Sequence, residues 1–177
     1  MKILSVPFLL IVCLHLTLSS CEKRRVAKRL EGTWLVKSYT RANLNMLQIK
    51  DSVFLFSPVC DTFKVETRSD YTINYIFKRD GEVSRKSQIT KSLPDLNSPL
   101  DGACNPRFTT ASFDSLITGK WVYAEGGSLA IEFPLMVDNI NMSFNNDEEM
   151  VWEQVIQIDT GILKFSGVER FILQKQR

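Results

Sequence analysis

Histidine is almost absent from this sequence: it occurs once, as His15. That position lies in an N-terminal apolar segment that we expect to be removed, so the remaining chain would contain no imidazole. Ser-His-Asp and Cys-His catalysis, and zinc or haem held by histidine, are therefore excluded. An excess of one charge is also lacking, since 22 Lys and Arg stand against 20 Asp and Glu. A near-neutral chain has no general field that attracts nucleic acid.

The N-terminus has the features of an export signal. Lys2 is followed by an apolar run, residues 3–18, that is shorter than the roughly 20 residues of a comfortable membrane span. The run ends in Leu18-Ser19-Ser20-Cys21, which resembles the lipobox cleaved by lipoprotein signal peptidase before a diacylated cysteine. The alternative is an ordinary signal peptide that happens to precede a cysteine.

The lipobox resemblance implies three segments. Residues 1–20 would be a signal peptide, residues 21–29 a lipidated basic tether, and residues 30–177 a single domain. The membrane would be contacted through palmitate-type chains on Cys21, in the cell envelope of a bacterium, with the outer membrane as the expected site. The basic residues of the tether could lie on anionic headgroups; a solvated tether or a helical turn packed under the domain is the alternative.

Cysteine is scarce as well. Of the four cysteines, Cys13 leaves with the signal segment and Cys21 carries the lipid. Cys60 and Cys104 remain, and in an exported domain two thiols most simply form one disulfide. Two free buried thiols are the alternative.

Beyond residue 30 the pattern is that of β-strands. In residues 71–78 the large side chains Tyr71, Ile73, Tyr75 and Phe77 alternate with polar ones, which predicts a half-buried strand. The same period appears in residues 61–66, 128–133, 163–165 and 171–174. Residues 53–56 are a further strand candidate in the less readable region 41–58.

Turn residues separate these runs. Asp80-Gly81 predicts a tight hairpin, and further turns are expected at residues 125–128 and 159–161. Residues 92–107 contain Pro94, Pro99 and Pro106 and predict a long loop, because proline removes backbone donors. Cys104 would pin this loop. Short strands joined by tight turns indicate sequential antiparallel pairing.

Several motifs, kept in order over residues 30–176, resemble bacterial lipocalin-like lipoproteins. They are Gly32-Thr33-Trp34, Cys60-Asp61-Thr62-Phe63, Thr118-Gly119-Lys120-Trp121, Gly126-Gly127-Ser128-Leu129 and Phe171-Ile172-Leu173-Gln174-Lys175-Gln176. The chain departs from the family pattern in regions 41–58 and 92–107.

This resemblance implies an all-β fold: an antiparallel up-and-down β-barrel of about eight strands. It also implies that Trp34 closes one end of the barrel, with Gly32 beside it and a basic residue across the indole. Arg170 and Lys175 are both candidates, and spacing does not separate them; we assign Arg170.

The implied function is the binding of a small apolar ligand inside the barrel, without cofactor or metal. Six large side chains are the expected ligand-lining residues: Phe63, Tyr71, Tyr75, Phe77, Trp121 and Phe133. An interior of this width holds one small molecule or is filled by side chains. The alternative is therefore a packed barrel that acts as a protein-interaction or inhibitor module of the envelope.

We expect no enzymatic activity. An enzyme would need paired carboxylates, and the acidic run Asp147-Glu148-Glu149 is the clearest candidate. That run lies between two strand candidates and fits a solvated loop. It also lacks the alternating spacing and central glycine of a calcium loop.

Overall fold

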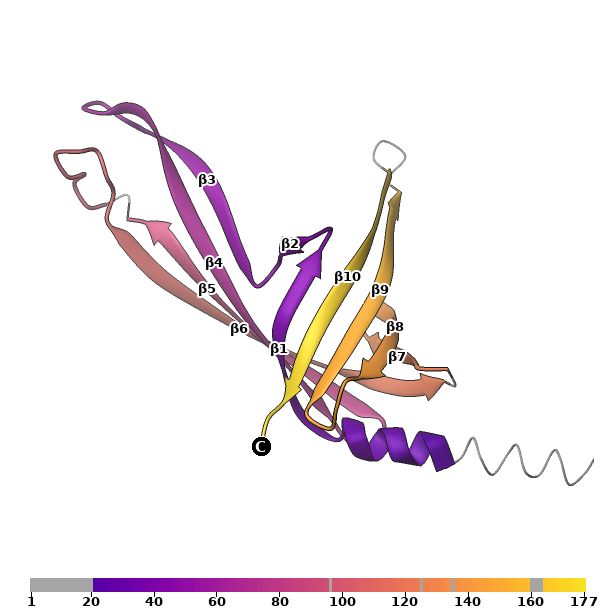
Figure 1. Ribbon diagram of the computed structural model, residues 1–177. Helices are drawn as coiled ribbons and strands as arrows, with labels where there is room; N and C mark the ends of the chain where they lie inside the picture. Colours follow the sequence, from indigo (N-terminus) through magenta and orange to yellow (C-terminus); the bar gives the residue numbers. More distant parts are fainter. Residues whose placement is uncertain (1–20, 96, 125, 135, 160–163) are drawn as a thin grey trace, which may run out of the picture.

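The computed structural model describes residues 21–177 except 96, 125, 135 and 160–163 (Figure 1). Residues 21–30 form a helix, and nearly all of the remaining described chain is β-strand or turn. The ten strands are β1 (Gly32–Arg41), β2 (Leu44–Asn45), β3 (Gln48–Ser57), β4 (Asp61–Phe77), β5 (Glu82–Pro94), β6 (Phe108–Ala124), β7 (Ser128–Phe133), β8 (Met136–Phe144), β9 (Glu149–Asp159) and β10 (Lys164–Lys175). Among the described residues, no helix is long and apolar enough to cross a membrane.

Eight of the strands close into a barrel. The sheet order is β2-β1-β10-β9-β8-β7-β6-β5-β4-β3, every pairing is antiparallel, and a further pairing of β1 with β4 joins the two sides. The closing register is short and runs from Gly32 opposite Phe77 to Leu35 opposite Asn74. The two remaining strands, β2 and β3, extend the sheet beyond the closure. The all-β, antiparallel, eight-stranded barrel expected from the sequence is confirmed.

The hairpin between β4 and β5 follows directly from its turn residues. Gly81 has a φ of 90°, and the Asp80 side chain accepts a hydrogen bond from the Glu82 backbone N–H at 3.1 Å. Positive φ is a conformation that glycine adopts without steric cost. The turn expected before Ser128 is also present, with positive φ at Gly126 and Gly127. The turn expected at residues 159–161 lies largely outside the described residues.

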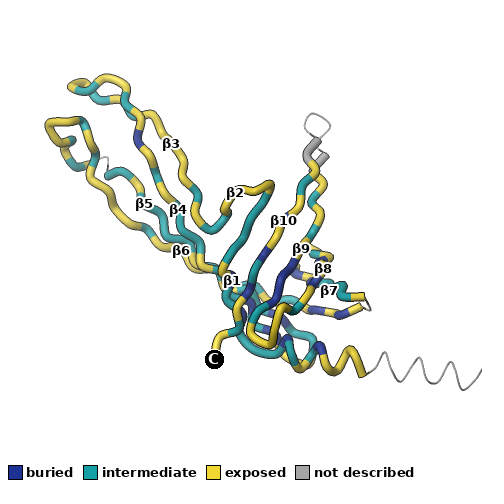
Figure 2. Tube along the Cα trace, viewed as in Figure 1, coloured by how far each residue is buried: buried dark blue, intermediate teal, exposed yellow. Residues whose placement is uncertain are grey.

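One end of the barrel is closed by the helix of residues 21–30. Val26 and Leu30 face inward from the helix, and Leu30 and Trp34 are completely buried. The Trp34 indole N–H donates a 2.6 Å hydrogen bond to the Leu30 carbonyl. Buried residues concentrate at this end (Figure 2). The basic segment is thus a helix packed under the barrel, and the boundary expected before Leu30 falls inside it.

The basic residue over the Trp34 indole is Lys175, so the assignment of Arg170 is wrong. The Lys175 Nζ lies 5.3 Å from the centre of the ring system and donates to the Arg29 carbonyl at 2.8 Å. Gly32 leaves room for the Lys175 side chain, because a Cβ at position 32 would lie 3.1 Å from Lys175 Cε. Arg170 is separated from Lys175 by an odd number of positions in β10. Because successive side chains of a strand alternate between its two faces, Arg170 lies on the opposite face from Lys175. It is exposed and forms an ion pair with Glu153 instead.

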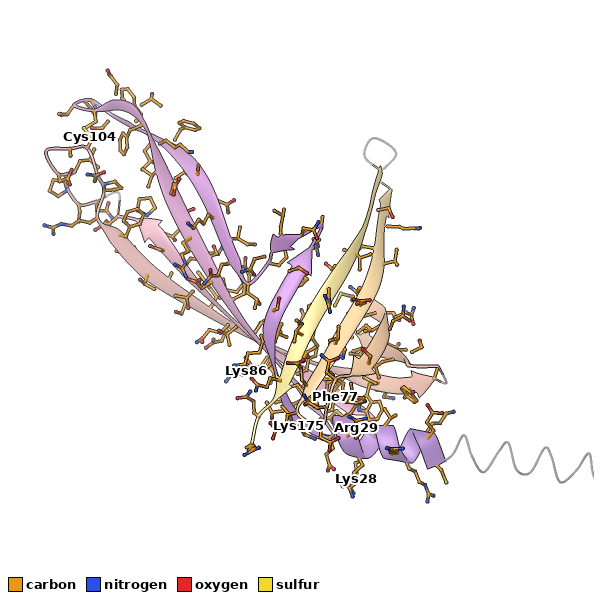
Figure 3. All side chains as sticks on the ribbon, in the orientation of Figure 1. Lys28, Arg29, Phe77, Lys86, Cys104 and Lys175 are labelled. Carbon is orange, nitrogen blue, oxygen red and sulfur yellow. A yellow bond between two sulfur atoms is a disulfide. The ribbon has the colours of Figure 1, made fainter. Side chains whose placement is uncertain are left out.

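The other half of β4, β5 and β6 leaves the barrel as a long arm, completed by β3 (Figure 1). β3 pairs with residues 61–70 of β4. At the arm's tip Cys60 and Cys104 form a disulfide with a Cα–Cα distance of 5.9 Å, which confirms the expected pair (Figure 3). The expected loop 92–107 is shorter than predicted, because β5 continues to Pro94 at its end.

Candidate ligand-binding site

A cavity of about 180 Å³ lies inside the barrel above the closed end. It is lined from six strands: β1, β4, β5, β8, β9 and β10. Its apolar wall includes Ile73, Met136, Ile140, Trp152 and Phe171. A water molecule occupies roughly 30 Å³ of liquid, so the cavity has the volume of a small molecule rather than of a single water.

Packed aromatic side chains form the floor of this cavity. Trp152 meets Tyr75 edge-on, with ring centres 4.7 Å apart, and meets Phe77 at 5.9 Å. Phe77 in turn contacts Trp121 at 6.1 Å. Tilted and edge-to-face arrangements at these distances are the favourable ones for aromatic rings. The closed half of the barrel interior is therefore filled, and the interior cavity lies in the open half.

A buried carboxylate, Glu169, lies on one side of the cavity. It accepts hydrogen bonds from the Tyr39 hydroxyl at 2.7 Å, from Arg41 Nε at 2.5 Å and from Gln154 Nε2 at 2.5 Å. Burial, together with the neighbouring Glu169, raises the pKa of Tyr39 to about 12. Arg41 supplies the compensating charge. Glu169 is thus satisfied by its own neighbours.

Two further ionisable groups, Arg85 on β5 and Asp138 on β8, line the same cavity. Burial raises the pKa of Asp138, the nearby Arg85 opposes that rise and Glu169 adds to it. Burial likewise raises the pKa of Tyr75, beside Arg85, to about 12. Both tyrosines are therefore neutral hydroxyls at physiological pH. The interior of the open half combines an apolar wall with two acids, Asp138 and Glu169, and two bases, Arg41 and Arg85.

The six expected ligand-lining residues fall into four places. Tyr75 lines the cavity, while Phe77, Trp121 and Phe133 are packed into the closed half. Tyr71 is half-buried on β4, next to Ile89 of β5. Phe63 lies at the tip of the arm, in a separate cavity of about 290 Å³ between the β3–β4 turn and the proline-rich loop.

Sequence reasoning missed the charged residues of the cavity: Arg41, Arg85, Asp138 and Glu169. A signal for three of them was present in the alternation. Glu169 is two residues before the buried Phe171, Arg85 two after the buried Val83, and Asp138 two before the buried Ile140. A charge in phase with core residues along a strand points inward.

The acidic run 147–149 is outside this site. Asp147 pairs with Arg29 at 3.2 Å, Glu148 pairs with Arg177, and Glu149 accepts a hydrogen bond from Asn145 at 2.6 Å. These contacts tie the β8–β9 turn to the helix and to the last residues. Among the described residues, no group of three or more His, Cys, Asp or Glu side chains could hold a metal ion.

The fold and the cavity define a class, an antiparallel eight-stranded barrel with one packed end and one open end. Comparison with known proteins adds no closer assignment: no protein-family model, no curated protein and no solved structure matches the chain.

Proposed function

We propose that this protein is a membrane-anchored, non-enzymatic lipoprotein of lipocalin-like type that binds a small ligand with an apolar part in the open half of its barrel. The observation that carries the proposal is the cavity above a filled floor, lined on one side by Ile73, Trp152 and Phe171. A concave site with an apolar wall and a few convergent polar groups is the usual form of a ligand pocket.

The inner face of the arm extends this site. Cross-strand pairing places Tyr71 opposite Ile89, and Ile89 opposite Phe113, in one row. Opposite residues of antiparallel strands share a face, as do residues two apart, so this row continues the face that carries Ile73 and Ile117. Phe113 is 54% exposed. A ligand longer than the cavity therefore has an apolar surface along which to lie.

The anchor belongs to the same proposal. Cys21 is exposed at the start of the helix that lies across the closed end, away from the arm (Figure 1). The side chains of Lys23, Arg24 and Lys28 are exposed on the same helix. With acyl chains on Cys21, the closed end would face the membrane and the open half would face away from it. Each basic residue near an anionic surface would add about 1 kcal/mol.

Intact-mass measurement of protein purified from its own host tests the anchor. We expect cleavage before Cys21 and the added mass of acyl chains. An unmodified Cys21, or cleavage at another residue, would overturn this part of the proposal and leave the ligand site untouched.

Calorimetric titration of the exported Cys21→Ser protein with decanol tests the ligand site. We expect saturable binding that is lost in Ile73→Trp, because the larger side chain fills the cavity. Val155→Trp is the matched control, since Val155 is 67% exposed outside the site. Equal loss in both variants, or no binding by the unsubstituted barrel, would refute the proposal.

The second candidate is a protein-interaction module, and one observation favours it. β3 is the last strand of the sheet, and its Phe54 and Phe56 are 72% and 74% exposed. A long edge strand with exposed apolar side chains is the geometry by which a strand of another protein is added to a sheet. A photo-crosslinker at Phe56 in the native envelope should then give one defined adduct, which Phe54→Asp abolishes. A diffuse set of adducts would count against this candidate.

A further inference from the structure

The four charged side chains of the cavity form one ion pair, Arg41 with Glu169, and one pair that is not in contact, Arg85 and Asp138. Glu169 accepts three hydrogen bonds from Tyr39, Arg41 and Gln154, and its charge is balanced by Arg41. Arg85 and Asp138 also line the cavity, but they come from β5 and β8, which are not neighbours in the sheet. Arg85 Nε is buried without a hydrogen-bond partner, which costs free energy, and Asp138 is half-buried without an ion-pair partner among the described residues.

Asp138 is half-buried on β8. Its carboxylate accepts no hydrogen bond and forms no ion pair with any residue that the structure describes. Burial therefore raises its pKa. Its neighbours along the face are apolar: Ile140 is buried two residues on, and Ile131 lies opposite on β7.

Arg85 is the complementary case. Its Nε is buried and has no hydrogen-bond partner within the described part of the chain. The guanidinium carbon lies 5.6 Å from the centre of the Phe133 ring, above the filled floor. Arg85 and Asp138 are not within ion-pair distance of each other, since no such contact occurs between these two described residues. The open half thus presents the unpartnered Nε–H of Arg85 and the unpaired carboxylate of Asp138 to the same small volume.

We propose that Arg85 and Asp138 form a two-point subsite for the head of a zwitterionic amphiphile, with the ligand's carboxylate on Arg85 and its ammonium group on Asp138. This inference rests on the proposed ligand-binding function and names the class of ligand. A simple acid would match Arg85 but would face the Asp138 carboxylate. A simple amine would match Asp138 but would face Arg85.

The tail of such a ligand has a defined path. From the row of Tyr75, Arg85 and Ile117 to the row of Tyr71, Ile89 and Phe113 is four residues along each strand. At about 3.4 Å per residue this is about 14 Å, to which a decyl chain is comparable in length. A head at Arg85 therefore places the tail on the apolar inner face of the arm.

Four probes with the same tail test the subsite: decanol, decanoic acid, decylamine and 2-aminodecanoic acid, titrated calorimetrically into the Cys21→Ser protein. We expect 2-aminodecanoic acid to bind at least about tenfold more tightly than each of the others, because charge-assisted hydrogen bonds strengthen both contacts. Arg85→Gln should remove its advantage over decylamine, and Asp138→Asn its advantage over decanoic acid. Arg170→Gln and Glu153→Gln, an exposed pair outside the cavity, should leave the ranking unchanged.

The possible results distinguish a failure of the subsite from a failure of the proposed ligand-binding function. If all four probes bind equally, the subsite is wrong and the apolar site stands. If decanoic acid or decylamine alone is preferred, the zwitterionic head is wrong. If none of the probes binds, the proposed function itself fails. The ranking by the unsubstituted barrel does not depend on how well any variant folds.

Discussion

Replacing Trp34 by Ala tests whether the closed end stabilises the barrel. Trp34 is completely buried and contacts the fold from three sides: its indole N–H bonds to Leu30, Lys175 lies over the ring, and the Phe144 ring centre is 6.2 Å away. The substitution therefore opens a cavity between the helix and the first strand. It also leaves the Leu30 carbonyl without its donor.

The magnitude follows from these contacts. Truncating a buried aromatic side chain to Ala costs about 3–5 kcal/mol. The lost hydrogen bond accounts for about 1 kcal/mol of this cost. A domain of this size is stable by about 5–15 kcal/mol, so Trp34→Ala should remove a large share of it. Trp34→Phe keeps most of the ring volume but removes the N–H. It should cost about 1–3 kcal/mol, mainly through the unpaired Leu30 carbonyl.

Denaturant titration of the three proteins, followed by circular dichroism, measures these differences. The midpoints should fall in the order of the unsubstituted protein, Trp34→Phe and Trp34→Ala, with similar slopes. A midpoint for Trp34→Ala within the equivalent of about 0.5 kcal/mol of the original would refute the reasoning, since exposed positions behave in that way. Equal losses in both variants would assign the whole effect to the hydrogen bond.

Three further predictions follow from contacts elsewhere. Lys175→Ala should cost about 1–2 kcal/mol in denaturant titration, whereas Arg170→Ala should cost less than about 0.5 kcal/mol, because only Lys175 contacts the indole; equal costs would contradict this. Because the folded pKa of Asp138 is raised above its ordinary value of 3.8, the protein should lose stability as pH rises from that value through the raised one; Asp138→Asn should lose less over the same range, and parallel pH profiles would contradict the assignment. Cys104→Ser should cost at most about 4 kcal/mol on the loop-entropy model and should speed hydrogen exchange first in residues 97–107; unchanged exchange there would show that the disulfide does not hold the loop.

The strand pattern was readable from the sequence, but the lengths of the strands were not. Alternation over residues 71–78 predicted a strand correctly, and so did residues 61–66. They are one strand, β4, because the intervening Arg68-Ser69-Asp70 contains no turn-forming pair and continues the pairing with β3 and β5. A polar interval interrupts a hydrophobic pattern without bending the backbone.

The candidate site was less predictable, for a different physical reason. Alternation assigns a side chain to a face of its own strand, but the cavity is formed by residues of six strands. Which of them meet is decided by register between strands far apart in sequence. Phe77 and Trp121 were expected beside a ligand and instead form the floor, since both lie at the level where the barrel is closed.

The short pairing of β1 with β4 explains why charged side chains occur inside this barrel. β4 pairs with β1 over four residues, up to Leu35, and with β3 over residues 61–70. β1 separates from β4 where its register shifts between Val36 and Ser38. An eight-stranded interior is just wide enough for side chains to fill, and here the packed side chains lie where all eight strands are joined. Below that level the interior is filled by aromatic and aliphatic side chains.

Above that level β1 no longer pairs with β4, and the interior side chains change from apolar to charged close to Tyr75. Tyr75 lies opposite Trp34 on one side and opposite Arg85 on the other, so it is at the boundary between the two environments. A charged side chain beneath Tyr75 would pay the full cost of desolvation, whereas Arg85 and Asp138 keep access to the open half. The short β1–β4 pairing therefore does more than shape the barrel: it leaves Arg85 and Asp138 in the half of the barrel that β1 and β4 do not close. Lengthening that pairing would fill or seal the site, and the arm that β3 completes would lose its continuity with the interior.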